Sequence, residues 1–181
     1  MSLHADAYEL LTGWAAPDAT QAALRDDYVA HLAARPDAMQ RSCLPHHLTA
    51  SALVVSDDGS RVLLTLHRRL RRWLQTGGHC EDQDSTLSGA ALREATEESG
   101  IAGLSVDPVP LRLDRHPVPC GGRDDAEHLD VQLLALAPAD AVPAISEESL
   151  DLAWFPVDAL PETDDSVRAL VAAARTRLTL A

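Results

Sequence analysis

Cysteine, aromatic residues and basic residues are all scarce in this 181-residue chain. Its three cysteines, Cys43, Cys80 and Cys120, form no CxxC pair and have no zinc-like spacing. Their odd number argues against a disulfide scaffold, and a reducing cytoplasmic location is expected. No apolar run approaches the roughly 20 residues that cross a bilayer, and the first residues lack the pattern of a signal peptide. We therefore expect a cytoplasmic protein without membrane contacts.

Basic residues are outnumbered, with 15 Lys and Arg against 28 Asp and Glu, which gives a net charge of -13. A chain this acidic repels the phosphate backbone, so nucleic acid is not expected as a partner. A small anionic substrate would need a bound cation and local arginines to reverse the field around it. The charge balance thus already indicates a metal. With 46% apolar residues, one compact domain with a small extension is expected.

A change in composition and periodicity divides the chain into an N-terminal helical extension over residues 1–45 and a main domain over residues 46–181. The extension is rich in Ala, Leu and Asp at helical spacing, and two or three helices are predicted there, the second beginning at Pro17. We assign it only packing or the contacts of a possible homodimer. The main domain is predicted as a hairpin of strands 48–55 and 61–67, a helix over 87–99, strands near 103–115, 129–137 and 150–155, and a helix over 165–178. This is an α+β pattern with a mixed sheet, arranged as an α/β/α sandwich.

The most informative stretch is the helix over residues 87–99, which Gly100 is expected to end. At about 100° per residue, one arc of about 120° holds Leu87, Ala90, Ala91, Glu94, Glu97, Glu98 and Ile101. A stripe that begins and ends with apolar residues is predicted to face inward, where three carboxylates would repel one another and lose hydration. A hard divalent cation would relieve both costs. The pattern therefore predicts a metal site on these three glutamates.

Carboxylates at positions i, i+3 and i+4 are ligands typical of Mg²⁺, with Mn²⁺ as an alternative. Arg93 lies one turn before Glu97 and is expected to hold its carboxylate in place. The other interpretation of an ExxEE pattern in an acidic chain is a solvated helix face. The inward register and the Gly77–Gly78 pair just upstream favour the metal site.

Two stretches together resemble the Nudix box, whose pattern is GX5EX7REUXEEXGU: Gly77-Gly78-His79-Cys80-Glu81 and Ala90-Ala91-Leu92-Arg93-Glu94-Ala95-Thr96-Glu97-Glu98-Ser99-Gly100-Ile101. The second stretch matches at every fixed position. The first departs, because Asp84 is the sixth residue after Gly78 and eight residues separate it from Arg93. The first glutamate of the box is therefore absent, and whether Asp84 replaces it is left open.

This resemblance implies the Nudix fold over about residues 47–178, with hydrolysis of a phosphoanhydride bond by metal-activated water. The substrate implied is a nucleoside diphosphate linked to another group. Glu94, Glu97 and Glu98 would hold Mg²⁺ with the backbone of Gly78, and Glu97, Glu98 and Arg93 would take part in catalysis. Glu148 lies in the loop where some Nudix enzymes supply a catalytic base; the alternative is an inert exposed acid.

Five residues are candidates for substrate contacts. Gly77 would bring its backbone close to the ligand, although a simple tight turn explains it equally well. His79 directly follows the glycines and could bind phosphate, or serve only a structural role. Arg68 and Arg69 belong to the one dense basic run and could grip phosphate, or could balance nearby acids in a solvated loop. His128 lies beside a Pro/Gly-rich stretch that is typical of a loop at a site mouth.

Two other functions on the same fold remain open. A nucleotide-binding sensor domain without turnover would bind the same ligands and regulate a partner. An isopentenyl-diphosphate-type isomerase would need a catalytic cysteine and a separate histidine-rich metal site. Only Cys80 and His79 support this alternative.

Overall fold

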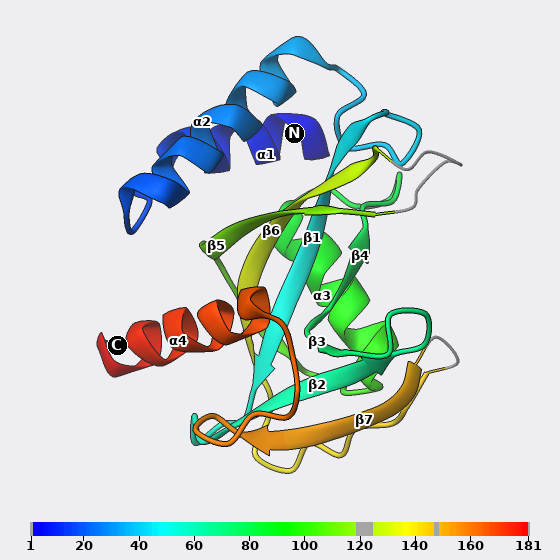
Figure 1. Cartoon of the computed structure of the whole chain (residues 1–181), viewed down its shortest axis with the longest axis vertical. Coiled ribbons are helices and arrows are strands. Elements are labelled where there is room, and N and C mark those ends of the chain that lie inside the picture. The colour runs from blue at the N-terminus through cyan, green and yellow to red at the C-terminus, as the bar shows by residue number, and fades with distance from the viewer. Residues whose placement is uncertain (1, 119–124, 147–148, 181) are drawn as a thin grey trace.

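The computed structural model describes the chain except residues 1, 119–124, 147–148 and 181. Within the described part, four helices and seven strands follow one another along the chain (Figure 1). In chain order they are α1 (Leu3–Gly13), α2 (Ala19–Ala34), β1 (His46–Val55), β2 (Arg61–His67), β3 (Trp73–Leu74), β4 (Thr76–His79), α3 (Leu87–Ser99), β5 (Ser105–Pro117), β6 (Glu127–Leu136), β7 (Ser149–Pro156) and α4 (Asp165–Leu180). None of the described helices is long and apolar enough to cross a membrane.

All seven strands belong to one mixed sheet. Its main path runs β3-β2-β1-β6-β5, while β4 pairs with β1 and β7 pairs with β2. The two longest central partners, β1 and β6, are parallel, and the other pairs are antiparallel. The predicted hairpin of β1 and β2 is confirmed, and so is the α+β class with a mixed sheet.

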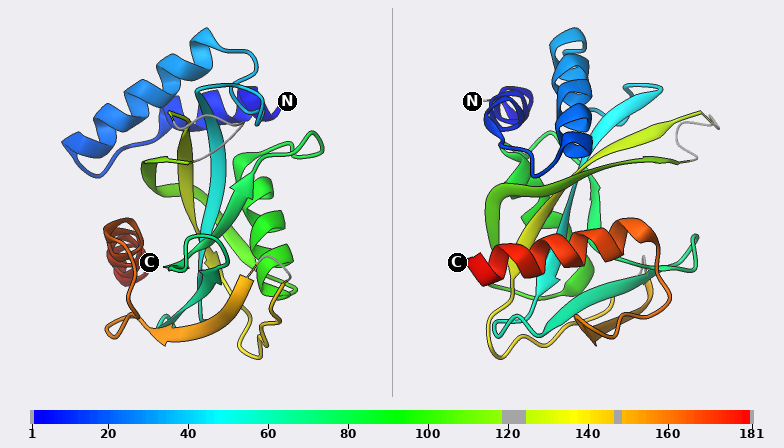
Figure 2. Two further views of the ribbon diagram at one scale, coloured as in Figure 1. Left: turned by 45° about the vertical axis from the view of Figure 1, so that its right-hand side comes forward. Right: turned by 60° about the vertical axis from the view of Figure 1, so that its left-hand side comes forward.

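Helices cover both faces of this sheet, as the predicted α/β/α sandwich requires. Side chains of β1 alternate, so Leu48 and Ala50 join the core beneath α3, while Leu53 and Val55 join the core beneath α4. The left view of Figure 2 shows α3 and α4 on opposite sides of the central strands. Toward the start of β1 the α4-side face becomes polar, with His47, Thr49 and Ser51 in a row. This polar end carries part of the candidate site.

The N-terminal helices share the core of the main domain and cover the edge strand β5. The Gln21 side chain accepts a hydrogen bond from the Leu113 amide at 2.6 Å and donates to its carbonyl at 3.0 Å, as a neighbouring strand would. Asp6 accepts a hydrogen bond from the Leu87 amide at 2.9 Å, at the first turn of α3. The second helix begins at Ala19 and not at Pro17, because Asp18 is its N-cap.

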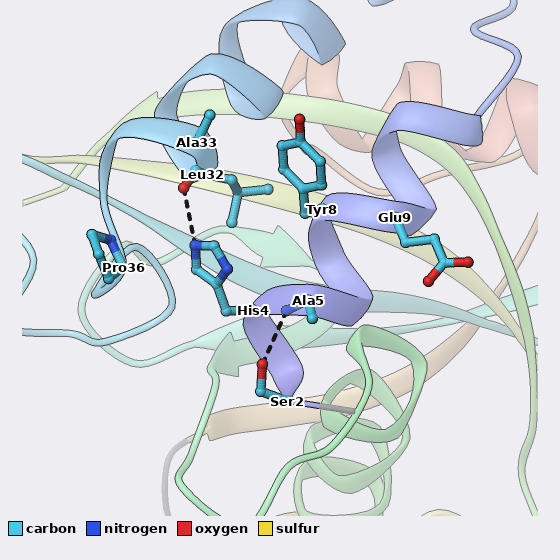
Figure 3. A pocket seen from close by; sticks show the side chains of 8 residues that line it. All are labelled: Ser2, His4, Ala5, Tyr8, Glu9, Leu32, Ala33 and Pro36. Atoms are coloured by element: carbon cyan, nitrogen blue, oxygen red, sulfur yellow. Dashed lines mark hydrogen bonds between the residues drawn. The ribbon is translucent and has the colours of Figure 1, made fainter.

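A surface hollow of about 730 Å³ lies between α1 and α2 (Figure 3). His4 crosses it and its Nε2 lies 3.0 Å from the Leu32 carbonyl oxygen, which ties the two helices together. Tyr8 and Glu9 line the hollow beside it, and none of the predicted site residues does so. It is a gap between packed helices rather than part of the site.

Candidate functional site

Helix α3 begins and ends where the sequence predicts, because both ends are capped. The Thr86 hydroxyl accepts a hydrogen bond from the Gly89 amide at 3.0 Å, and Gly100 takes the left-handed conformation with φ of 66°. The buried residues of the helix are Leu87, Ala90, Ala91, Ala95 and Ser99. The helix face that packs on the sheet therefore includes the small side chains of Ala95 and Ser99 in place of the glutamates.

The predicted inward register of the three glutamates is therefore only partly correct. Glu94 is enclosed, with 15% of its side chain exposed, but Glu97 is 59% exposed. The Glu98 side chain is intermediate, and its Oε2 atom is buried. Small residues pack more closely on the sheet than carboxylates do, which explains the rotation. The three carboxylates line the border between the core and the solvent, where a ligand can reach them.

Arg93 gathers four acceptors around one guanidinium group. Its Nη1 donates to Glu94 Oε1 at 2.9 Å and to Glu97 Oε2 at 3.1 Å. Its Nη2 donates to the His79 carbonyl at 2.9 Å, and Asp84 accepts from Nη2 at 3.0 Å and from Nε at 3.3 Å. The pKa of Arg93 is raised, chiefly by the hydrogen bonds to Asp84. Because one nitrogen holds both Glu94 and Glu97, the two carboxylates lie side by side.

Asp84 is the carboxylate whose role the sequence left open. It lies in the loop before α3, is only 5% exposed, and contacts Arg93 through both of its oxygens. It also accepts a hydrogen bond from the Glu81 amide at 2.8 Å, which closes the loop. Asp84 therefore holds the Arg93 guanidinium in place from the loop before α3, on the opposite side of Arg93 in the sequence from Glu94 and Glu97.

The glycine pair lies in β4, paired with β1, and each glycine meets a different neighbour. A Cβ on Gly78 would lie 2.7 Å from Glu94 Oε2, so the Gly78 backbone touches the carboxylate directly. Gly77 has φ of 153°, and a Cβ there would collide with Ser51 of β1. Close strand packing, rather than a tight turn, explains Gly77.

The remaining acidic and basic candidates lie around the loops. Arg68 and Arg69 are exposed in the loop between β2 and β3, and Arg68 Nη2 reaches the Ser149 carbonyl at 3.5 Å, at the start of β7. Glu148 lies outside the described residues. Cys80 is buried in the core on the α3 side, and burial raises the pKa of its thiol to about 12.

The structure brings His79 and His128 together with a third histidine, His47. The His47 ring stacks on His79 with centroids 5.1 Å apart and meets His128 edge-on at 4.9 Å. Burial, followed by the neighbouring histidines, lowers the pKa of His79 to about 4 and that of His128 to about 3. Burial also lowers the pKa of His47, so all three rings are neutral at pH 7. Sequence reasoning missed His47 because only the pairing of β1 with β6 and β4 places it beside the other two.

Polar residues continue along the same sheet face next to these histidines. Asp130 is buried and accepts hydrogen bonds from Thr49 at 2.9 Å and from Ser51 at 2.6 Å, and burial raises its pKa. His116 Nδ1 lies 2.8 Å from Asp114. Burial alone would lower the pKa of His116, but the hydrogen bond with Asp114 and nearby carboxylates outweigh it and raise that pKa.

Comparisons with known proteins identify the family and the fold of the chain. A family model described as "NUDIX domain" matches residues 45–174. No curated protein matches the chain. A Nudix-family hydrolase from Clostridium perfringens is 23% identical, with 75% of this chain and 98% of that chain covered and a TM-score of 0.56.

Two further solved structures are similar. The NUDIX domain of Shewanella oneidensis NrtR, complexed with ADP ribose, is 20% identical, with 72% and 87% of the two chains covered and a TM-score of 0.56. A UDP-X diphosphatase is 17% identical, with a TM-score of 0.54, and its match covers 97% of this chain and 91% of that chain. The expected fold is thereby confirmed.

Proposed function

The chain belongs to the Nudix family, and on that premise we propose that it is a Mg²⁺-dependent pyrophosphohydrolase acting on a nucleoside diphosphate linked to another group. The observation that best supports this proposal is the Arg93 cluster, in which one guanidinium holds Glu94 and Glu97 beside the Gly78 backbone. We further propose that it acts in the cytoplasm, and that residues 1–45 form an extension of a catalytic domain over residues 46–181.

The donor atoms at this place fit a hard divalent cation. Glu94, Glu97 and Glu98 supply carboxylate oxygens. The Gly78 backbone lies close to the Glu94 carboxylate, so the Gly78 carbonyl can serve as a further ligand in the same site. Oxygen-only donors suit Mg²⁺, and Mn²⁺ accepts the same set. When bound, such an ion would supply positive charge that stabilises the phosphate oxygens in the transition state and favours ionisation of the attacking water.

The residues of the chain divide the remaining work by their position. Arg93 is a positioning residue, because its hydrogen bonds fix Glu94 and Glu97 while its own charge is held by Asp84. The Glu97 side chain is 59% exposed, so a substrate can reach its carboxylate from the solvent. Arg68 and Arg69 are exposed at one loop, where they can bind substrate phosphates and offset the acidic field.

The substrate class rests on similarity. Solved relatives of this fold include a domain complexed with ADP ribose and a UDP-X diphosphatase. Both names contain a nucleoside diphosphate joined to a second group. A net charge of -13 disfavours nucleic acid, so we propose a small-molecule partner.

The test is a screen of nucleoside diphosphate compounds, including ADP-ribose and UDP-sugars, with Mg²⁺ or Mn²⁺. Glu97→Gln and Glu98→Gln are expected to lower kcat by at least about 100-fold with unchanged circular dichroism, because each removes a negative ligand. Glu162→Gln, an exposed acid before α4, is the charge-matched control and should keep full activity. Undiminished hydrolysis in both site variants would refute the metal assignment.

The alternatives predict different outcomes in the same screen. A sensor domain would bind nucleotides tightly and release no product. An isomerase needs a reactive cysteine beside its metal, but Cys80 is buried among apolar side chains with its thiol pKa raised to about 12. That environment keeps the thiol protonated and inert.

A further inference from the structure

His47, His79 and His128 form a cluster in which ring nitrogens without hydrogen-bond partners lie close together. One ring nitrogen of each histidine lies within 4.8 Å of those of the other two. The Nε2 atoms of all three are buried and have no hydrogen-bond partner among the residues that the structure describes. Buried polar atoms in folded proteins almost always have a partner. Three exceptions in one cluster indicate a ligand.

The backbone around His47 determines which of its nitrogens faces that ligand. His47 is fully buried, and its Nδ1 lies 3.2 Å from the Cys43 carbonyl oxygen. A carbonyl oxygen can only accept, so Nδ1 carries the proton and donates it. In a neutral imidazole the Nε2 atom then has a free lone pair. A carbonyl that orients a histidine in this way is the usual outer partner of a metal-binding imidazole.

We propose that His47, His79 and His128 bind one divalent transition-metal ion of the Zn²⁺ class, with the fourth position open to water or another ligand. Three atoms separated by at most 4.8 Å lie within about 2.8 Å of a common point. Zn–N bonds are about 2.0–2.1 Å, so each ring needs to move by about 0.7 Å. Imidazole nitrogens select Zn²⁺, Co²⁺, Ni²⁺ or Cu²⁺ over Mg²⁺.

This site is separate from the carboxylate cluster, because strand β4 stands between them. Neighbouring residues of a strand point to opposite faces. His79 is paired with Thr49 on the polar face, whereas Gly78 is paired with Ala50 and contacts Glu94 on the α3 side. The two donor sets also differ in chemistry, nitrogen on one face and oxygen on the other. Each set therefore selects its own ion.

An ion at this point would join three strands near their ends. His47 belongs to β1, His79 is the last residue of β4, and His128 is near the start of β6. The loop from β4 to α3 begins directly after His79. Because the ion binds only the folded chain, it should raise the free energy of unfolding and the melting temperature.

Direct metal binding by the tag-free full chain tests the proposal. After treatment with EDTA, the protein is titrated with Co²⁺ and Zn²⁺ in excess Mg²⁺, which saturates the carboxylate cluster. Visible d–d bands of Co²⁺, calorimetry and elemental analysis should give about one ion per chain. Zn²⁺ should also raise the melting temperature.

Two variants, His79→Gln and His128→Gln, should bind at least about 100-fold more weakly and lose the Co²⁺ bands. Both residues are only partly buried, and circular dichroism verifies that the variants fold. His46→Gln, next to His47 but paired with Glu127, is the matched control and should bind as wild type does. Glu98→Gln should also retain the Co²⁺ bands while it loses hydrolysis, which separates this proposal from the proposed function.

Three results would overturn the histidine site. One is wild-type protein that binds neither Co²⁺ nor Zn²⁺ in excess Mg²⁺. Another is binding that stays unchanged in both His79→Gln and His128→Gln. The third is loss of the Co²⁺ bands in Glu98→Gln alone, which would assign the transition metal to the carboxylates.

Discussion

Removal of the Arg93 guanidinium should destabilise the fold mainly through one partner, Asp84. The substitution Arg93→Ala leaves four acceptors without their donor, but these differ in exposure. Asp84 is 5% exposed and bonded through both oxygens, while Glu97 is 59% exposed and can turn to water. The cost is therefore set by the buried carboxylate that remains.

The size of this effect follows from the burial of the pair. Breaking a buried ion pair by removing one partner costs about 3–5 kcal/mol, whereas an exposed pair contributes about 0–1 kcal/mol. Arg93 itself is 16% exposed, so we expect Arg93→Ala to lower the free energy of unfolding by about 3 kcal/mol. A domain with an ordinary stability of about 5–15 kcal/mol still folds after that loss.

Urea unfolding of two double-mutant cycles measures the difference. The cycle of Arg93→Ala with Asp84→Asn should give a coupling energy of about 2 kcal/mol, because the second change removes the stranded charge. The cycle of Arg93→Ala with Glu97→Gln should give less than about 1 kcal/mol. A larger coupling with Glu97 than with Asp84, or a loss below about 1 kcal/mol in Arg93→Ala alone, would refute the reasoning.

Three further predictions concern the glycine pair, Gln21 and Asp58. Gly78→Ala should lower kcat with little loss of stability, because the new Cβ would displace only the flexible end of the Glu94 side chain. Gly77→Ala should prevent or strongly impair folding, because its Cβ would meet the β1 backbone at a residue with positive φ. Kinetics and urea unfolding curves of both variants distinguish the two effects. Gln21→Ala should lower the free energy of unfolding by about 2–3 kcal/mol in urea titrations, because it leaves two buried backbone groups of Leu113 unpaired. Hydrogen bonds from Ser56 and Ser60 lower the pKa of Asp58 to about 2, below its unfolded value near 4, so its stabilising effect is present at pH 7, declines as the pH falls below about 4 and is gone only below about 2. Asp58→Asn should be less stable than wild type at pH 7, and urea midpoints should show the difference shrinking as the pH falls toward about 2.

Features that depend on nearby residues could be predicted from the sequence. The bounds of α3 followed from its apolar spacing and from Gly100, which adopts the expected left-handed cap. The β1–β2 hairpin followed from two apolar runs around Asp57–Ser60, and it forms as expected. In each case the deciding interactions lie within a few residues of one another along the chain.

Features that depend on tertiary packing could not be predicted in the same way. Periodicity placed Glu97 inward, but the packing of Ala95 and Ser99 against the sheet turned the helix and left Glu97 exposed. His47 is 81 residues from His128, and the two are brought together only by the parallel register of β1 and β6. No local pattern encodes that register, because it is fixed by the two cores on either side of the sheet.

The short strand β4 explains why both proposed sites depend on one stretch of sequence. Its alternation directs Gly78 to the carboxylate cluster and His79 to the histidine cluster, while Gly77 lets the strand lie close to β1. The two faces are also joined by a hydrogen bond, since Arg93 donates to the His79 carbonyl at 2.9 Å. A displacement of His79 therefore changes the anchor of the guanidinium that holds Glu94 and Glu97. Gly77, Gly78 and His79 contact residues on both faces of the sheet, so a substitution at any one of them is expected to affect both proposed sites.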